Sequence, residues 1–394
     1  MGKVKLSISI PYKQRIDNLK IVFQALANQT MAKSEFEVIV GAMEYSEEFI
    51  TLCKKFNNDI NIISVLSDKD FSIPRARNLA TRQASGEILI QMDADTLLPT
   101  NALQNLYDKH FAFSQKICIV GQVIGYGNNN DGDVKNVEIL PYSEYQKALV
   151  DLEKYYDNPQ DPRFQVTHVI PWAFGWTGLI AIPLDIIKAH SLYFDESFHG
   201  WGVDDLEWSY RICRTGTPII LCKDISAIHL PHIRDQSANS DSEKQNYLRF
   251  IKKWPYIDVE LAYAFGDVKA NDLFLEYNQE INNAVTIKGN RLTVVHCRIN
   301  TQEILLVGVE VNNQGNIINA KIRDFFNINA EKTIFSLIGM ALPYNNKQIS
   351  KCYVFPTIKK FPNLYMDKVQ QEVNRVSKET VIVDKKVSCL EGII

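Results

Sequence analysis

A short apolar run ends in two carboxylates in the segment Glu87-Ile88-Leu89-Ile90-Gln91-Met92-Asp93-Ala94-Asp95. The six residues before Asp93 have the length and composition of a buried strand, and the helical pattern before them ends at Ser85-Gly86. A helix followed by such a strand is typical of a parallel sheet with helices on its faces. Ligands of these sheets bind at the carboxyl ends of the strands, where Asp93 and Asp95 are expected.

The same alternation extends through the first hundred residues and changes beyond about residue 265. Strands are predicted at 6–10, 36–40, 60–66 and 87–92, and helices at 18–28, 47–56, 76–84, 142–156, 184–190 and 205–215, with a turn-rich loop at 126–135. Strands at 291–299, 303–311, 316–322 and 380–390 and a helix at 365–377 follow. We therefore predict an α/β domain with a mostly parallel sheet at residues 1–264, and a smaller α+β accessory region of unknown role at 265–394.

Composition excludes several classes of protein. A net charge of −3 over 394 residues indicates no clustered positive field for nucleic-acid binding. Seven scattered cysteines, none in a Cys-x-x-Cys pair, suit a reducing cytosol better than a disulfide framework or thiolate zinc site. We expect no signal peptide, and no segment has the roughly 18 apolar residues of a membrane span. The expected location is the cytoplasm, with peripheral association at the inner membrane face as the alternative; the oligomeric state stays open.

Two aspartates and two histidines are candidate metal ligands. Asp93 and Asp95 would repel each other unless a cation lay between them, although an acidic pair can also simply cap a strand. Their place after a buried strand favours the cation. His229 and His232 could be ordinary loop residues, but with carboxylates upstream they complete an oxygen and nitrogen site. Such a mixed site favours Mn²⁺ over Mg²⁺, and either imidazole can instead orient another ligand.

A second acidic pair, Asp204-Asp205, follows Gly200-Trp201-Gly202. The glycines permit the backbone conformations of a loop that closes on a substrate. Acidic residues also stabilise the start of the helix predicted at 205–215, so Asp204 can cap this helix while Asp205 acts as a general base. Trp201 offers a flat apolar face to a ligand ring, or else belongs to the core.

Three arginines lie near predicted strand ends or a helix start. Arg15 follows the first strand and either contacts a base or phosphate or is solvated. Arg75 and Arg77 lie at a helix N-terminus, where phosphates bind readily. The alternative for this pair is an ion pair with a carboxylate that holds the loop of Asp93 and Asp95.

Five ordered motifs over residues 5–240 resemble family 2-type glycosyltransferases of the GT-A fold. The resemblance is strongest to the branch shared by animal β-1,4-galactosyltransferases and bacterial chondroitin-type polymerases. Residues 10–15 are similar to the nucleotide-binding opening of that family, 75–78 to its second donor motif, 93–95 to its metal motif and 174–178 to its Phe-Gly-Gly acceptor segment. Residues 200–205 look like its Gly-Trp-Gly-Gly-Glu-Asp motif, and His232 stands in a segment similar to its His-x-Arg-Asp stretch.

The resemblance implies an inverting transfer of a hexose or N-acetylhexosamine from a UDP-sugar to a hydroxyl of a glycan acceptor, with Mn²⁺ or alternatively Mg²⁺. It implies that Asp205 is the catalytic base. It implies acceptor contacts from Asp204, Trp201, Gly202 and Trp176, nucleotide-sugar contacts from Pro11, Arg15, Glu44, Arg75, Arg77, Asp93 and Ala94, and metal ligation by Asp95, His232 and His229.

Some residues depart from the family pattern, and other functions stay open. The usual acidic pair after the second strand is reduced to Glu44, and Val203 and Asp204 replace the Gly and Glu of the later motif. A peptide- or protein-modifying transferase with a Ser, Thr or Cys acceptor is one alternative. A non-catalytic sugar-binding protein on a degenerate transferase fold is another, although such a protein would not need both carboxylate sets. A nucleotidyltransferase has no use for residues 200–205.

Overall fold

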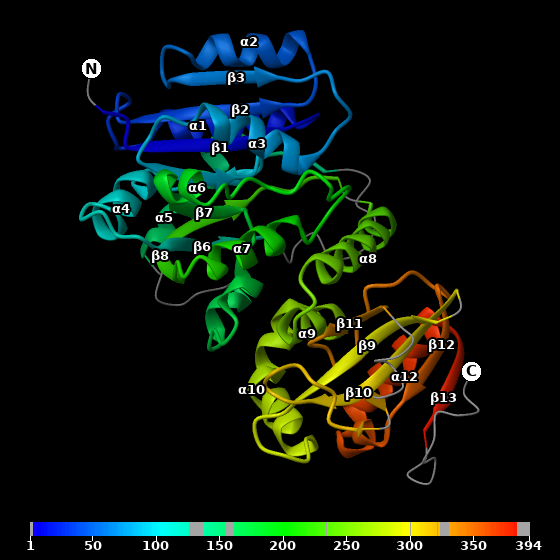
Figure 1. Cartoon of the computed structure of the whole chain (residues 1–394). Helices are drawn as coiled ribbons and strands as arrows, with labels where there is room; N and C mark the ends of the chain where they lie inside the picture. The colour runs from blue at the N-terminus through cyan, green and yellow to red at the C-terminus, as the bar shows by residue number, and fades with distance from the viewer. Residues whose placement is uncertain are drawn as a thin grey trace. The chain divides into compact units, whose positions relative to one another are not determined.

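The computed structural model describes residues 3–125, 137–154, 161–233, 235–299, 301–320, 322–323 and 331–383 (Figure 1). The chain forms two compact units, Met1–Asn246 and Tyr247–Ile394. The sequence-based division after residue 264 places residues 247–264 in the first domain, whereas the second unit of the structure begins at Tyr247. The loop predicted at 126–135 lies outside the described residues.

The first unit is built on an eight-stranded sheet in the order β3-β2-β1-β4-β7-β6-β8-β5. Its strands are β1 (Leu6–Tyr12), β2 (Phe36–Ala42), β3 (Ile62–Leu66), β4 (Ile88–Met92), β5 (Thr96–Leu97), β6 (Cys118–Ile124), β7 (Leu179–Pro183) and β8 (Ile219–His229). Strands β3, β2, β1 and β4 are parallel, while β7 runs antiparallel to both β4 and β6. The predicted α/β class is confirmed, with a mixed sheet.

Helices flank this sheet, and the four strands predicted in the first hundred residues are all present. The helices are α1 (Ile16–Ala27), α2 (Glu47–Phe56), α3 (Ile73–Gln83), α4 (Ala102–His110), α5 (Tyr142–Lys154), α6 (Leu184–Ala189) and α7 (Asp204–Arg214). Helix α8 (Gln236–Lys253) begins in the first unit and ends in the second. Helix α2 begins after Ser46, whose hydroxyl accepts a hydrogen bond from the Phe49 amide at 3.1 Å. The apolar sides of β1, β2 and β4 pack with α1 and α2 in one continuous core.

One close approach between helix and sheet depends on glycine. A Cβ atom on Gly41 of β2 would lie 2.0 Å from the carbonyl oxygen of Ala76 in α3. Only a residue without a side chain therefore lets α3 lie this close to the sheet. The N-terminal turn of α3, with Arg75 and Arg77, is thereby held next to the carboxyl ends of the strands.

The second unit contains a five-stranded sheet in the order β11-β9-β10-β12-β13. Its elements are α9 (Ile257–Phe265), α10 (Asp267–Ala284), β9 (Arg291–Ile299), β10 (Gln302–Val311), β11 (Glu331–Phe335), β12 (Ile349–Val354), α12 (Asn363–Val376) and β13 (Ser377–Ile382). The strand predicted at 316–322 is wrong, because Ile317 forms only an isolated bridge with Val311. The strand predicted at 380–390 is present as β13, and residues 384–390 lie outside the described chain.

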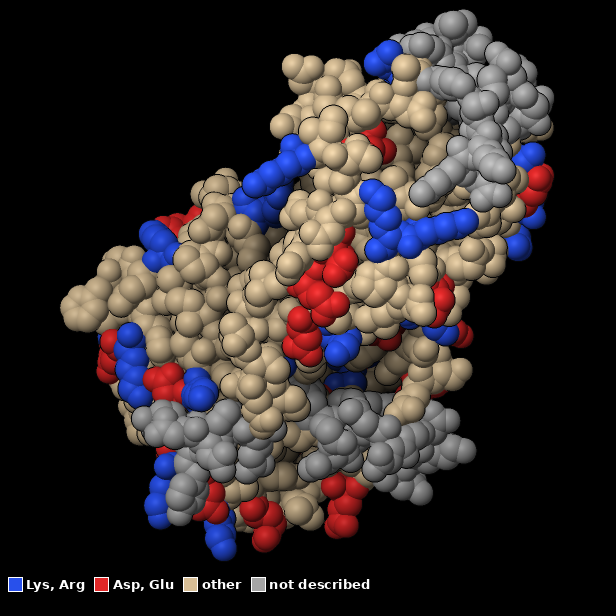
Figure 2. Space-filling model, turned by 90° about the horizontal axis from the view of Figure 1, so that it is seen from below, with Lys and Arg blue, Asp and Glu red and all other residues tan. Residues whose placement is uncertain are grey.

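Lys and Arg side chains are interspersed with Asp and Glu side chains over the face drawn in Figure 2, rather than separated into fields of one sign. Among the described residues, no helix combines the length and apolar character needed to cross a bilayer.

Candidate active site

The loop after β4 is brought next to the histidine segment at the end of β8 by a strand pairing that the sequence did not predict. Strand β5 continues from this loop and pairs antiparallel with the end of β8, which places Thr96 opposite His229. The Leu230 amide also donates a hydrogen bond to the carbonyl oxygen of Asp95 at 2.7 Å. These backbone contacts bring the histidine segment to Asp95 across more than 130 residues of sequence.

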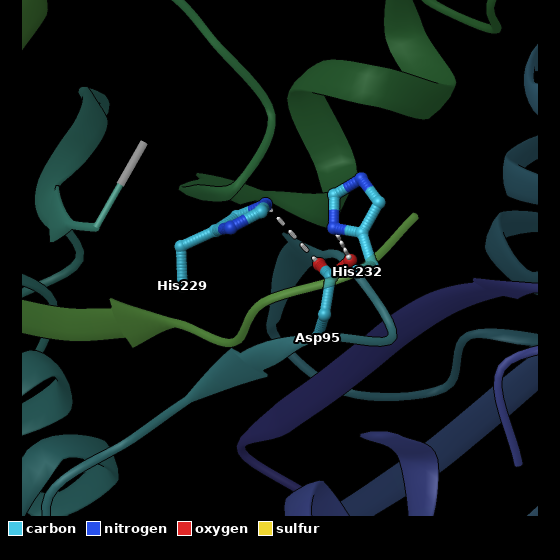
Figure 3. Close-up of side chains that lie close together, drawn as sticks. All are labelled: Asp95, His229 and His232. Carbon is cyan, nitrogen blue, oxygen red and sulfur yellow. Dashed lines mark ion pairs between the residues drawn. The ribbon is translucent and has the colours of Figure 1, made fainter. Parts of the chain in front are cut away.

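Asp95 is fully buried and lies between two imidazoles (Figure 3). His229 Nε2 is 3.6 Å from Asp95 Oδ1, and His232 Nδ1 is 3.2 Å from Asp95 Oδ2. Arg15, on the more exposed side, also forms an ion pair with Oδ2. Burial by itself would raise the pKa of Asp95, but His229, His232 and Arg15 together hold this pKa well below its usual range.

The three residues Asp95, His229 and His232 fit a divalent cation. Their potential ligand atoms all lie within 4.8 Å of one another. Among the described residues, Asp95 Oδ1 has no hydrogen-bond partner, although it is buried. A buried carboxylate oxygen in this state is a natural ligand, and one carboxylate with two imidazoles suits a divalent transition metal.

A second group with metal-ligand chemistry, His110, Cys222 and Asp224, lies elsewhere in the first unit. Here the carboxylate is already compensated, because Lys109 Nζ is 3.2 Å from one Asp224 oxygen and His110 Nε2 is 3.3 Å from the other. Burial raises the pKa of the Cys222 thiol to about 12, so this sulfur is protonated. We assign no metal to this group.

Arg77 connects the loop after β4 with the start of α7. Its Nη2 donates to Asp93 Oδ1 at 3.0 Å, and its Nη1 donates to Asp204 Oδ2 at 2.8 Å. Arg77 and Asp204 are both buried. Asp93 and Asp95 therefore have separate cationic partners. Arg77 adopts the ion pair with a carboxylate that was the alternative to phosphate binding for residues 75 and 77.

Asp204 and Asp205 form the first turn of α7, and the N-cap is Val203 with no side-chain hydrogen bond, so the expected capping by Asp204 is wrong. Burial and the adjacent Asp204 raise the pKa of Asp205 to about 7, and Arg77 partly opposes this rise. Asp205 remains partly exposed, which leaves it accessible to a substrate. The residue before this pair, Val203, has a left-handed φ of 72°. A glycine adopts this conformation without steric cost, whereas the β-branched Val203 is strained in it.

Arg75 contacts a segment that sequence reasoning did not single out. Its Nε donates to Glu196 Oε2 at 3.1 Å, and Asn78 donates to the other oxygen of Glu196 at 3.0 Å. Asn78 also bonds the backbone of Phe194 in both directions. These bonds fasten residues 194–196, which lead into the Gly-Trp-Gly loop, to the N-terminal half of α3. No sequence pattern marks Glu196, because its partners are more than 100 residues away.

The other predicted residues lie at the ends of strands or in loops. Pro11 is in β1 opposite Gly41, and Glu44, just after β2, accepts a hydrogen bond from the Gln14 amide at 2.7 Å. Ala94 is buried between the two aspartates. The Trp176 ring lies 4.6 Å from the guanidinium of buried Arg163. Trp201 is 48% exposed, and Gly202 has a φ of 88°, so this loop presents a large aromatic ring to solvent.

Comparison with known proteins finds a match to one family model over part of the chain. Residues 7–169 match the model of glycosyl transferase family 2. The chain is 28% identical over 287 residues to validoxylamine A glucosyltransferase of Streptomyces hygroscopicus subsp. jinggangensis, covering 69% of this chain and 67% of that protein. The same match to the enzyme of subsp. limoneus covers 63% of that protein, so the matched region is about two thirds of these relatives.

A second relative and one solved structure extend the comparison. The chain is 25% identical over 273 residues to hyaluronan synthase of Pasteurella multocida, which covers 64% of this chain and 28% of that protein. The crystal structure of Staphylococcus aureus TarS 1-349 in complex with UDP-GlcNAc aligns with a TM-score of 0.48 and 15% identity, covering 72% of this chain and 74% of that one.

Proposed function

We propose that this chain, whose residues 7–169 match the model of glycosyl transferase family 2, is an inverting, metal-dependent glycosyltransferase of the GT-A type. The proposed donor is a UDP-sugar that carries a hexose or N-acetylhexosamine. The proposed acceptor is a hydroxyl group of a glycan. The observation that carries the proposal is the Arg77 bridge, which joins Asp93 after β4 to Asp204 beside the proposed base.

The donor end of the site is proposed to lie along the carboxyl ends of β1, β2 and β4. Asp95, His229 and His232 would hold the cation, which when bound neutralises charge on the diphosphate leaving group. Arg15 would add positive charge on the exposed side of Asp95, where the phosphates are expected. Glu44 lies beside the Gln14 amide and would contact the uridine ribose or base.

The acceptor end is proposed to be the loop before α7. Trp201 would stack its exposed ring on a sugar ring of the acceptor. Asp204, held by Arg77, would accept a hydrogen bond from the acceptor, and Asp205 would take the proton of the attacking hydroxyl. A pKa of about 7 suits this base, because it is ionised near neutral pH yet basic enough to accept a proton.

The proposed reaction is a single displacement. As Asp205 accepts the hydroxyl proton, the acceptor oxygen forms a bond with the anomeric carbon. The bond from that carbon to the diphosphate oxygen breaks, and UDP leaves with the bonding electrons. Because the oxygen attacks from the side opposite the leaving group, the anomeric configuration inverts. This chemistry needs both carboxylate sets, which the non-catalytic alternative does not.

The experiment that tests this function is a panel of UDP-sugars with Mn²⁺, assayed for UDP release with glycan acceptors and with Ser-, Thr- and Cys-containing peptides. We expect release that depends on one donor, on a glycan acceptor and on Mn²⁺, and a product of inverted configuration by NMR. Transfer to a peptide alone would favour the protein-modifying alternative. Binding of a donor without release under every acceptor condition would favour the sugar-binding alternative.

A further inference from the structure

Helix α8 contacts the loop of residues 199–202 through two side chains on one face of the helix. Ser242 and Asn246 are four residues apart, so they lie on the same face one turn apart. Asn246 is 1% exposed, although an asparagine in a helix interior usually faces solvent. Neither residue belongs to a motif of the donor or acceptor site.

Asn246 is bonded to the loop backbone in both directions. Its Nδ2 donates to the carbonyl oxygens of His199 and Gly202, both at 2.9 Å, and its Oδ1 accepts from the His199 amide at 3.3 Å. A side-chain amide matches the donor and acceptor of a peptide group, so Asn246 replaces the backbone partner that this irregular loop lacks.

Ser242 contacts the peptide groups of Trp201. The Trp201 amide donates to Ser242 Oγ at 3.0 Å, and the Trp201 carbonyl oxygen lies 3.1 Å from the same hydroxyl. The loop also packs tightly here, because a Cβ atom on Gly200 would lie 2.5 Å from Ser242 Cβ. The backbone of Trp201 is thus bound to α8 while its ring remains exposed.

The backbone conformation of the loop of residues 199–202, and of Val203 after it, requires stabilising contacts from outside the loop. Gly200, Gly202 and Val203 all have left-handed φ angles, of 72°, 88° and 72°. For the β-branched Val203 this conformation is strained, and such strain persists only when surrounding contacts enforce it. Asp204 and Asp205 follow directly, so the position of the loop also determines where α7 begins.

We propose that Ser242 and Asn246 are positioning residues for the acceptor, an inference that rests on the proposed function. They hold residues 199–202 so that the Trp201 ring and Asp205 face the same acceptor. Their described contacts to the loop are with residues 199–202, and they are therefore expected to act on acceptor affinity rather than on donor binding. Substitutions in α8 would thus change which sugar acceptor this protein prefers, even when the sequence of the loop stays the same.

The test compares Asn246→Asp and Ser242→Ala with two matched variants of the same helix. Asn246→Asp is nearly isosteric but replaces the donor with an oxygen that repels the carbonyls of His199 and Gly202. Gln245→Glu makes the same chemical change at an exposed neighbour, and Ser240→Ala removes a hydroxyl from an exposed serine. If Asn246→Asp does not fold, Ser242→Ala at the half-buried position still tests the proposal.

Two measurements are made: hydrogen exchange tests whether the two side chains hold the loop, and kinetics tests whether this matters for sugar transfer. Hydrogen exchange of the loop amides, followed by mass spectrometry, should be faster in Asn246→Asp and Ser242→Ala than in the matched variants. In steady-state assays the acceptor KM should rise about 10-fold in Asn246→Asp, with the donor KM within 2-fold of the wild type. Unchanged exchange, or equal rises in both KM values, would overturn the proposal. If the wild type transfers no sugar, the proposed function fails, while the exchange experiment still tests whether Ser242 and Asn246 hold the loop.

Discussion

The chemistry of single residues in this protein depends on how the two aspartates after β4 are separated. Asp95 is surrounded by His229, His232 and Arg15, and Asp93 pairs with Arg77. Two carboxylates that would repel each other in a shared position are thus each stabilised by their own cationic partners. The same separation divides the work proposed for the site, with metal binding at Asp95 and alignment of Asp204 through Arg77.

The first residue-level prediction concerns the base. Asp205→Asn should reduce transfer at least about 10³-fold, because the amide cannot accept the hydroxyl proton while substrate contacts persist. UDP binding, measured by calorimetry with Mn²⁺, should stay within 2-fold of the wild type. Asp185→Asn, a change at an exposed aspartate of α6, serves as the control and should leave both quantities unaltered. Near-normal turnover of Asp205→Asn would exclude the residue as base.

The raised pKa of Asp205 also predicts a pH dependence with a definite sign. In the folded protein this pKa is about 7 rather than 3.8, so between about pH 4 and pH 7 the folded state binds a proton that the unfolded state releases. The stabilising contribution is present at low pH and is lost as the pH rises through 7. Because Asp205→Asn cannot ionise, its melting temperature relative to the wild type should increase from pH 5 to pH 8. Activity should change oppositely, falling about 10-fold per pH unit below 7. A melting difference independent of pH would contradict the assignment.

A third residue-level prediction concerns the cation. Asp95→Ala should abolish Mn²⁺ binding in isothermal titration calorimetry with UDP present, because the buried carboxylate is the only anionic member of its group. Asp224→Ala is the matched control, since this aspartate also lies beside a histidine but is neutralised by Lys109. Loss of Mn²⁺ binding in Asp224→Ala, with retention in Asp95→Ala, would place the metal at the other group.

At the scale of elements, the site exists because secondary structures approach each other closely at a few points. Strand β5 is only two residues long, yet its pairing with β8 brings His229 to Asp95. Helix α3 approaches β2 so closely at Gly41 that its N-terminal turn carries Arg77 to Asp93 and Asp204. The pairing of β5 with β8 and the approach of α3 to Gly41 involve backbone atoms. They therefore tolerate changes of neighbouring side chains, but the approach of α3 does not tolerate a side chain at Gly41.

Gly41→Ala tests the helix-sheet approach. The added methyl group would meet the Ala76 carbonyl oxygen at 2.0 Å, and a backbone atom cannot rotate away, so we expect destabilisation by about 3 kcal/mol or more. Gly216→Ala is the comparison, because nothing lies within 4 Å of its Cβ position and only its φ of 82° is unfavourable. That variant should lose about 1 kcal/mol in denaturant unfolding. Similar losses in the two variants would show that α3 can move.

At the scale of the whole molecule, the chain consists of two units with separate cores. In the second unit, buried Glu260 of α9 accepts hydrogen bonds from the amides of Ile338, Gly339 and Met340, at 2.9, 2.7 and 2.8 Å. This carboxylate joins α9 to a segment about 80 residues later. The contact explains why α9 belongs to the second unit, although it follows the first unit directly in the sequence.

Glu260→Ala should therefore destabilise the second unit selectively. Three buried amides would lose their acceptor, at a cost of about 3 kcal/mol or more in total. In differential scanning calorimetry we expect one unfolding transition to move to lower temperature while another stays in place. Tyr277→Phe removes only the hydroxyl that donates to Glu260 at 3.3 Å, and should shift the same transition much less. A uniform shift of all transitions would indicate that the two units unfold as one.

The sequence by itself determined the α/β alternation and the candidate residues at the strand ends. Both are local properties, because apolar periodicity over five to ten residues specifies a strand or helix, and polar residues directly after a strand must lie at the sheet edge. The segments 6–10, 36–40 and 87–92 were thus predictable, as were Asp93 and Asp95. Strand β5 has only two residues and carries no such signal, whereas the strands β6, β7 and β8 were not predicted although their sequences are rich in apolar residues.

Only the tertiary structure decided which residue meets which. Arg77 and Arg75 lie two positions apart in the same helix, yet Arg77 reaches Asp93 and Asp204 while Arg75 reaches Glu196. Asn246 is an ordinary helical asparagine in sequence, and the structure buries it against the 199–202 loop. Such pairings depend on the directions of side chains brought together from distant segments, and a pattern read along one chain contains no information on those directions.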